Sequence, residues 1–257
     1  MSTISYIEPN NLATLKEQAF ESFVKNRFDE ATSLYEQLIS LDSSNKTNYW
    51  YLGLSQLLQG QEEDAQMTWL LAIENAELDQ IEMCTNELEQ ILEKEAQRKE
   101  SLESNQDALT IRSHLCDVNP YNLTNLISIV LLSAKLKTFA STDIVDLGII
   151  DLLNSEEIIP LSEVILLEIL EKILAFVPLD ETVTQFIESI CLFHAQYRSA
   201  IINTLYAFST KIANENSSNT SRAIKILEIC LHLDSQNLEI LMYLLDLHLT
   251  LKTMKNL

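Results

Sequence analysis

The stretch Tyr49–Ala72, YWYLGLSQLLQGQEEDAQMTWLLA, decides the fold of this 257-residue chain. A shift of the sequence by 34 residues against itself places small residues on small residues and an aromatic residue on an aromatic residue. The matched pairs are Ala19 with Gly53, Asn26 with Gly60, Ala31 with Ala65, Tyr35 with Trp69 and Leu38 with Ala72. Self-similarity at a fixed period is typical of repeat proteins, in which each copy is one supersecondary unit. Residues 12–77 are therefore predicted to form two consecutive helical hairpins.

The period and the positions of these residues resemble the tetratricopeptide repeat. In that repeat two antiparallel helices cross at small residues, and a large side chain fills the space beside them. The second copy departs from the pattern at Gln56, where an aromatic residue is usual, and at Glu77, where proline is usual. We expect an all-α fold, a tetratricopeptide-like right-handed solenoid of antiparallel helix pairs. It should be regular in the N-terminal half and divergent after about residue 120.

The spacing of later markers predicts how the rest of the chain is organised. Ala108 follows Ala65 by 43 residues, nine more than one period, and we place the extra residues in one long helix over 78–99. Three repeats should then cover residues 1–121, and an unpaired first helix of a further repeat should cover 238–257. Two three-helix units should fill 122–237, because apolar positions recur at helical spacing there. The six helices are expected over 122–136, 141–153, 161–176, 180–194, 198–215 and 219–233.

Composition and charge limit the classes of function. The chain has 17 basic and 38 acidic residues, a net charge of −21 that repels nucleic acid and anionic membranes. Three glycines are too few for a phosphate-binding loop or a β-barrel. The N-terminus has no secretory signal pattern, and no apolar run is long enough for a membrane span. We expect a cytoplasmic protein that binds neither nucleic acid nor membranes.

The residue types that commonly serve in catalysis or metal binding are not spaced here as in known catalytic or metal-binding motifs. The four cysteines have no C-x-x-C pair, and the four histidines have no H-x-x-x-H pair. The charged residues of the long helix, from Glu87 to Glu103 and including Glu95, Arg98 and Lys99, are predicted to form a solvated face with i, i+4 pairs. We expect no metal, no cofactor and no catalysis on this chain.

Binding residues follow from the tetratricopeptide resemblance. In that family the first helix of each pair lines a concave groove, and the matching positions here are largely apolar. They are Ala13, Lys16, Phe20, Phe23, Val24, Thr47, Trp50, Leu54, Leu57 and Leu58. One interpretation is a hydrophobic groove for a partner segment, with Phe20, Phe23 and Trp50 as anchors. The other is that these side chains pack in the core, against the next helix or against Tyr6 and Ile7.

The segment 238–251 predicts a helix that is apolar nearly all round. Terminal repeats of solenoids usually present a polar outer face, because an uncovered apolar helix promotes association. Two explanations are open. Either the chain is the front portion of a longer protein, or this helix packs on a partner or on a second copy of the chain.

A second resemblance covers nearly the whole chain. The runs 49–54, 59–66 and 68–72, with the long charged helix and Val118-Asn119-Pro120, are similar to the N-terminal region of bacterial SPINDLY-type O-linked N-acetylglucosamine transferase homologues. This resemblance implies a helical region that presents protein partners to a separate glycosyltransferase domain, for which the sequence shows no pattern. The asparagine ladder of related transferases is missing, since Glu17, Tyr51 and Lys94 occupy its positions, and Phe20 replaces an asparagine of the chaperone-binding clamp.

Two functional hypotheses follow from these observations. The first is a non-catalytic interaction scaffold that binds a protein or peptide partner in its groove. The second is the substrate-recruiting part of a glycosyltransferase whose catalytic domain lies outside this chain.

Overall fold

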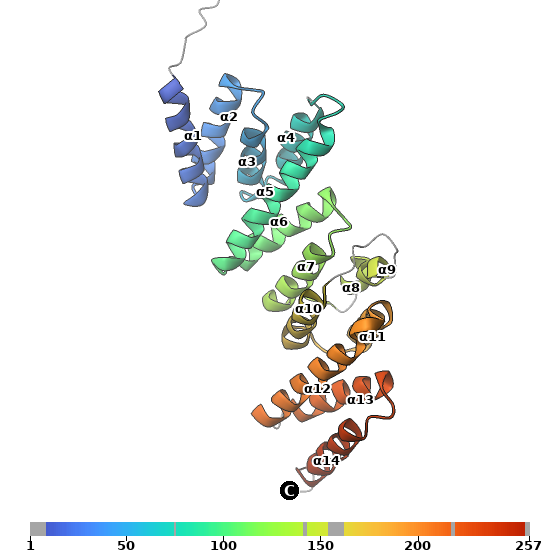
Figure 1. Cartoon of the computed structure of the whole chain (residues 1–257). Coiled ribbons are helices and arrows are strands. Elements are labelled where there is room, and N and C mark those ends of the chain that lie inside the picture. The colour runs from blue at the N-terminus through green and yellow to red at the C-terminus, as the bar shows by residue number, and fades with distance from the viewer. Residues whose placement is uncertain (1–8, 75, 141–142, 154–161, 217–218, 255–257) are drawn as a thin grey trace, which may run out of the picture. The chain divides into compact units, whose positions relative to one another are not determined.

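The computed structural model describes residues 9–74, 76–140, 143–153, 162–216 and 219–254. Within these ranges every regular element is a helix, and helices that follow one another largely pack as neighbours (Figure 1). The chain divides into two compact units, Met1–Pro120 (unit 1) and Tyr121–Leu257 (unit 2). The all-α class and the packing of helices in adjacent pairs are therefore confirmed. None of the described helices is both long enough and apolar enough to cross a membrane.

The described residues of unit 1 form three helical hairpins. Its helices are α1 (Pro9–Val24), α2 (Phe28–Leu41), α3 (Lys46–Leu57), α4 (Glu62–Glu74), α5 (Ile81–Ser101) and α6 (Asn105–Val118). Hairpin 1 is α1 with α2, hairpin 2 is α3 with α4, and hairpin 3 is α5 with α6. The 21-residue helix α5 confirms the single long helix expected over 78–99.

The turns inside the three hairpins have the same local structure. Each contains one residue with a positive φ angle, 58° at Asn26, 79° at Gly60 and 59° at Glu103. The next backbone N–H then bonds the carbonyl five residues earlier, in Arg27 to Ser22, Gln61 to Gln56 and Ser104 to Lys99. This is the Schellman arrangement that ends a helix. Five residues after each positive-φ residue lies a fully buried alanine, Ala31, Ala65 or Ala108, so the three hairpins are equivalent at this position.

The centre of hairpin 2 is a tryptophan packed on a glycine. The Trp69 ring lies so close to Gly53 that a Cβ atom on Gly53 would be 2.1 Å from Trp69 Nε1. That nitrogen donates a hydrogen bond to the Trp50 carbonyl oxygen at 3.2 Å. In hairpin 3 the position equivalent to Trp69, four residues after Ala108, holds Arg112, which is 2% exposed.

Hairpin 3 packs differently from hairpin 2. Helix α2 packs closely along α3, but α5 makes equally few contacts with α3 and with α4, and α6 makes few with α3. Buried apolar residues from all three hairpins belong to one core cluster. The long helix α5 therefore lies across hairpin 2 rather than simply beside it.

Unit 2 is also helical throughout the part that is described. Its helices are α7 (Leu123–Leu136), α8 (Asp143–Asp146), α9 (Ile149–Leu153), α10 (Glu163–Phe176), α11 (Glu181–Phe193), the 3₁₀-helix η1 (Ala195–Tyr197), α12 (Arg198–Glu215), α13 (Thr220–Leu233) and α14 (Leu238–Met254). Helix α10 packs on α7 and α12, whereas α11 packs on α8, α9 and α13. Side-chain caps start several of these helices, with Asp180 accepting from Val183 N and Asn122 from Asn125 N, both at 3.0 Å.

The prediction of one helix in unit 2 is wrong. The sequence predicts a single helix over 141–153, but the structure has α8 and α9 with Gly148 between them at φ 65°. An α-helix requires negative φ angles, so a left-handed residue interrupts it. Residues 141, 142 and 154–161 lie outside the described ranges. The remaining five expected helices of 122–237 are present with boundaries shifted by at most two residues.

Candidate binding surfaces

The residues predicted to line a groove in unit 1 fall into two groups. Phe20 is 40% exposed and Lys16 is half-buried. Thr47 and Leu58 are also half-buried, and Ala13 and Val24 are exposed. The predicted residues that are no more than 1% exposed and belong to the core cluster of unit 1 are Phe23, Trp50, Leu54 and Leu57. Tyr6 and Ile7, which the alternative interpretation places against them, lie outside the described residues. A partner could reach the four buried side chains only after a rearrangement of unit 1.

Helix α5 covers the face of α3 that carries these residues. Thr47 Oγ1 donates to Glu87 at 2.8 Å, and the Tyr51 hydroxyl lies 3.5 Å from Glu95. Side chains at i, i+3, i+4 and i+7 share one face of a helix, so Thr47, Trp50, Tyr51 and Leu54 lie together. Contacts of α5 with both Thr47 and Tyr51 therefore place α5 on the predicted groove surface.

The end of α5 also reaches hairpin 1. Lys99 Nζ donates to Asn26 Oδ1 at 2.8 Å and lies 5.1 Å from the centre of the Phe28 ring. The Arg98 guanidinium lies 5.6 Å from the centre of the Phe23 ring. Hairpins 1 and 3 thus touch directly at their turn ends.

The prediction of a solvated charged face on the long helix is wrong for part of α5. Glu95 and Lys99 are 0% and 1% exposed. Each is compensated by an opposite charge, because Arg98 Nε donates to Glu95 at 2.6 Å and Lys99 Nζ donates to Asp107 at 2.6 Å. The i, i+4 pattern could not reveal these contacts, because Tyr51, Asn26 and Asp107 belong to other helices or turns.

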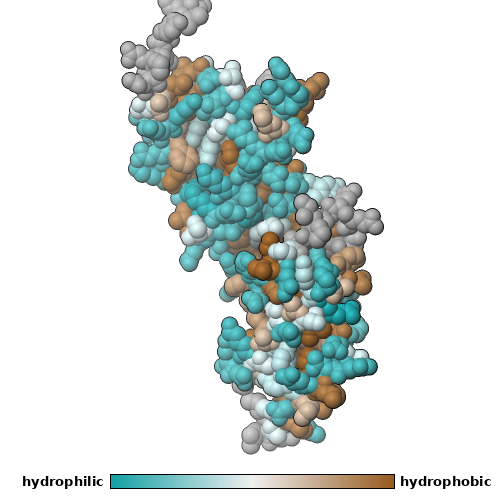
Figure 2. All heavy atoms as spheres, viewed as in Figure 1, coloured by the Kyte–Doolittle hydropathy of each residue, from teal (hydrophilic) through white to brown (hydrophobic). Residues whose placement is uncertain are grey.

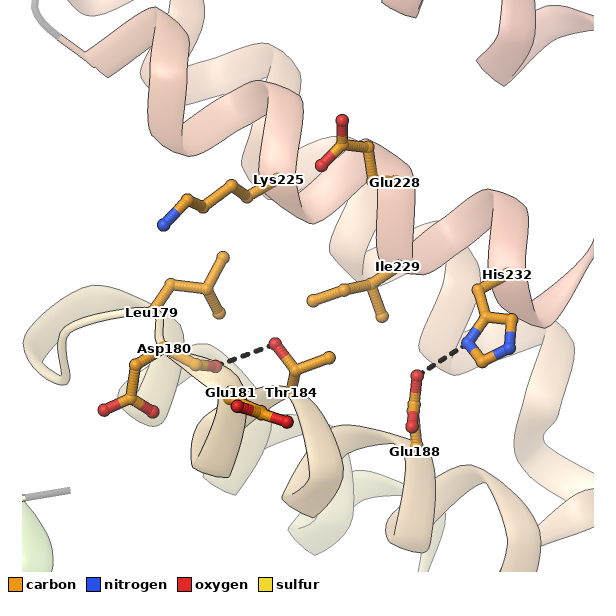
Figure 3. A pocket seen from close by; sticks show the side chains of 9 residues that line it. All are labelled: Leu179, Asp180, Glu181, Thr184, Glu188, Lys225, Glu228, Ile229 and His232. Atoms are coloured by element: carbon orange, nitrogen blue, oxygen red, sulfur yellow. Dashed lines mark hydrogen bonds and ion pairs between the residues drawn. The ribbon is translucent and has the colours of Figure 1, made fainter.

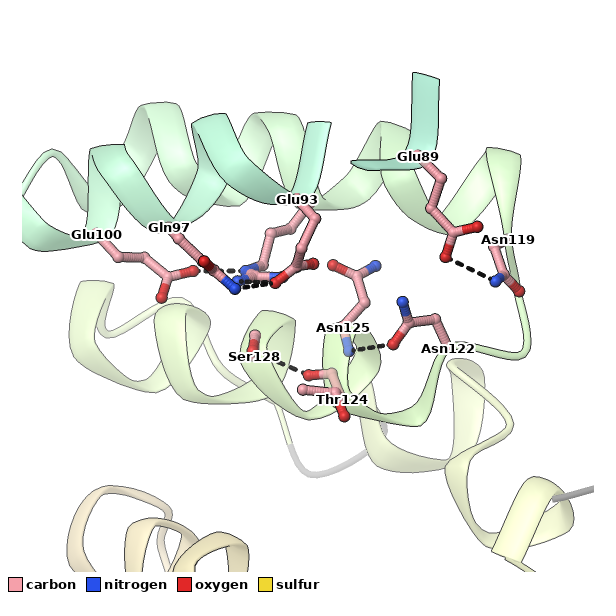
Figure 4. Close-up of polar contacts among 10 residues, drawn as sticks. Glu89, Glu93, Gln97, Glu100, Asn119, Asn122, Thr124, Asn125 and Ser128 are labelled. Carbon is pink, nitrogen blue, oxygen red and sulfur yellow. Dashed lines mark hydrogen bonds and ion pairs between the residues drawn. The ribbon is translucent and has the colours of Figure 1, made fainter. Parts of the chain in front are cut away.

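Arg112 on α6 forms ion pairs with two carboxylates on α5. Its guanidinium Nη1 donates to Glu93 at 2.9 Å, and its Nε donates to Glu100 at 2.5 Å. Burial by itself lowers the pKa of Arg112, but hydrogen bonds and charges of Glu93 and Glu100 outweigh it and raise that pKa. Near the other end of the hairpin, Glu89 on α5 accepts from the Asn119 amide at 2.8 Å (Figure 4).

A polar cleft of about 360 Å³ lies between α11 and α13 in unit 2 (Figure 3). Glu188 on α11 and His232 on α13 form a hydrogen bond of 2.6 Å across it. Asp180 caps α11, and the Thr184 hydroxyl donates to the Asp180 carbonyl at 2.8 Å. These polar groups are therefore already hydrogen-bonded within α11 or between α11 and α13.

Helix α14 presents an exposed apolar stripe. One face of α14 packs inward through Ile240, Leu244 and Leu247 and contacts α13. The opposite face carries large apolar side chains that are 39–71% exposed, namely Leu238, Leu241, Met242, Leu245 and Leu249. We call these five residues the α14 stripe. In the view of Figure 2, hydrophobic residues reach the surface of both units within a largely hydrophilic surround.

The cysteines and histidines form no recognisable centre in the described part of the chain. All four cysteines are free thiols, and Cys84, Cys191 and Cys230 are buried. Burial raises the pKa of Cys191 to about 11 and that of Cys230 to about 12, so both are protonated at neutral pH. The described residues contain no group of three or more His, Cys, Asp or Glu side chains that could hold a metal ion.

No protein-family model matches the chain, and no curated protein matches it.

Proposed function

We propose that the chain is a non-catalytic scaffold of tetratricopeptide-like hairpins that binds a helical segment of a partner protein. The equivalent buried alanines and turns of hairpins 1, 2 and 3 support the tetratricopeptide-like assignment. The same hairpins support the resemblance to SPINDLY-type helical regions. The proposed compartment is the cytoplasm, where free thiols such as these four cysteines persist.

The α14 stripe is the observation that carries the proposal. Its residues recur at intervals of three, four and seven, as in Leu238, Met242, Leu245 and Leu249, so they line one side of the helix. The buried residues of α14 lie on the opposite side, so α14 is apolar on two faces. Large contiguous apolar patches are rare on proteins that have no partner. An amphipathic helix that docks through its own apolar face is the matching ligand.

Charge decides which helix fits the stripe. The exposed residues Glu239 and Asp246 follow one edge of it, and the chain as a whole carries a net charge of −21. A second copy would bring an equal negative charge to the interface and be repelled at moderate ionic strength. A partner helix with lysine or arginine beside its apolar face would instead be attracted. The proposed occupant is therefore a basic amphipathic helix.

A synthetic amphipathic helix with leucines on one face and lysines on the other tests the proposal. Its binding to the full chain is measured by fluorescence anisotropy, with a peptide of the same composition in scrambled order as the control. We expect saturable binding of the amphipathic peptide and at least about tenfold weaker binding of the scrambled one. Met242→Gln and Leu245→Gln should each weaken binding about tenfold or more, whereas Leu71→Gln on α4 should leave it unchanged.

Two outcomes would contradict this function. Equal binding of both peptides would show that the negative charge alone attracts them. A dimer in analytical ultracentrifugation that Leu245→Gln dissolves would show that a second copy covers the α14 stripe.

The alternative, a substrate-recruiting region of a glycosyltransferase, rests on the hairpins that resemble that family. It uses the same partner-binding surfaces, so the peptide experiment does not separate the two. Under both proposals a titration with UDP-N-acetylglucosamine should show no saturable binding to this chain, and saturable binding would refute both.

A further inference from the structure

A second binding surface lies in unit 1, away from the predicted groove. A cleft of about 380 Å³ opens between α4 and α6. Helix α4 lines it with Trp69, Leu70 and Ile73, while α5 contributes Leu88 and α6 contributes Val118. The volume falls within the range of clefts that hold ligands in proteins.

The cleft exists because hairpin 3 departs from the packing of hairpin 2. Helix α2 packs closely along α3, but α4 makes few contacts with α5. Trp69 points inward onto Gly53, and only 4% of it is exposed. Leu70, the next residue, is 51% exposed although it lines an apolar cleft. A bulky apolar side chain inserted here would cover Leu70.

Polar groups stand at the edge of the cleft. The Gln66 amide and the Asp117 carboxylate each lie 3.5 Å from His114 Nδ1. The His114 ring also meets the Trp69 ring edge-on, with 6.0 Å between their centres. The Asp117 side chain is 69% exposed, so its carboxylate can accept from a donor outside the chain.

The charge around the cleft is uniformly negative on two of its three helices. No lysine or arginine lies between Lys46 and Lys94, whereas ten aspartates and glutamates do. This span includes all of α4 and the first half of α5. An acidic segment would be repelled here, and a basic segment would be attracted.

We infer that this cleft binds an extended partner segment in which one bulky apolar residue is flanked by lysine or arginine. The apolar side chain enters between α4 and α6, and a basic side chain pairs with Asp117. The site lies in unit 1, so it is separate from the α14 stripe, and either surface can fail its test independently of the other.

Three short fluorescent peptides test this inference on the full chain. The first has a central tryptophan flanked by lysines and arginines, the second has alanine in place of the tryptophan, and the third has glutamates in place of the basic residues. We expect the first to bind at least about tenfold more tightly than the second, because a buried aromatic anchor carries most of such contacts. The third peptide should not bind.

A pair of variants locates the site. Leu70 and Leu71 are neighbours on α4 with the same exposure of 51%, but only Leu70 lines the cleft. Leu70→Arg should weaken binding of the first peptide about tenfold or more, and Leu71→Arg should change it far less. An equal effect of the two variants would overturn the inference, because any added positive charge would then suffice.

A photo-crosslinking version of the first peptide provides a test on the unaltered chain. A photoreactive group at the apolar position should label residues of α4 or α6 that line the cleft. Labels confined to other helices, or equal affinity for the tryptophan and alanine peptides, would overturn the inference.

Discussion

In hairpin 2 the space between the two helices is filled by Trp69 against Gly53, whereas in hairpin 3 the equivalent residues are Arg112 and Ala96. The backbone turns are the same, with positive φ at Gly60 and Glu103. One hairpin is thus held by close apolar packing and the other by a buried cation with two carboxylates. The comparison teaches that the repeat fixes the position of a large side chain but not its chemistry.

The chemistry of that residue depends on what faces it. Glu93 and Glu100 are available on α5, and their side chains are 27% and 30% exposed. A buried arginine paired with both of them is electrically compensated, but an isolated one would be strongly destabilising. In hairpin 2 the single lysine is Lys46, at the first position of α3, and there is no arginine. Its centre therefore depends on apolar packing and on the hydrogen bond from Trp69 Nε1 to the Trp50 carbonyl.

The largest loss of stability is expected when the ion cluster of hairpin 3, Arg112 with Glu93 and Glu100, is broken. Arg112→Ala leaves Glu93 and Glu100 without their cation and opens a cavity, and it should reduce the free energy of unfolding of unit 1 by about 3 kcal/mol. Urea denaturation followed by tryptophan fluorescence measures this, because both tryptophans of the chain, Trp50 and Trp69, lie in unit 1.

A matched variant separates charge from volume. Arg112→Leu together with Glu93→Gln and Glu100→Gln removes every charge of the cluster and keeps an apolar side chain at the centre. It should recover most of the lost stability. If the triple variant is as unstable as Arg112→Ala, the arginine acts through its packing and not through its charge.

A smaller effect tests the packing of hairpin 2. Gly53→Ala adds a Cβ atom 2.1 Å from Trp69 Nε1, and the resulting overpacking should cost about 2 kcal/mol in the same urea experiment. In a Trp69→Phe background the same substitution should cost less, because the smaller ring leaves room for the methyl group. An unchanged cost in that background would show that the collision with Trp69 is not the cause.

The smallest effect concerns the turn that the two hairpins share. Glu103 holds φ 59° without the freedom of glycine, so Glu103→Gly should raise the urea midpoint by an amount equivalent to about 0.5 kcal/mol. The reverse change, Gly60→Ala at φ 79°, should lower the urea midpoint by an amount equivalent to about 1 kcal/mol in the free energy of unfolding. Changes of the opposite sign would mean that side-chain contacts outweigh the backbone at these positions.

Sequence reasoning predicted the hairpins well because they depend on local features. The small residues at Ala31 and Ala65 and the long helix now seen as α5 follow from spacing and helical propensity. The break at Gly148 was missed, although a glycine in a short apolar stretch was a visible signal. The apolar character of the 238–251 helix was also visible, and its residues form the α14 stripe.

The candidate sites were predicted less well, because their exposure depends on contacts between distant residues. Trp50 and Leu54 have the spacing of groove residues, yet both are 0% exposed. Lys99 and Asn26 are separated by 73 residues, and nothing local indicates that they touch. The cleft beside Leu70 likewise depends on how α4, α5 and α6 pack against one another.

The sequence by itself determined that this chain forms helical hairpins, since periodic small residues and turn residues act within a single hairpin. Only the tertiary structure decided which apolar faces remain exposed, because burial is a property of the neighbouring helix as much as of the residue. Helix α5 lies over the apolar face of α3, while the outer face of α14 has no described helix against it.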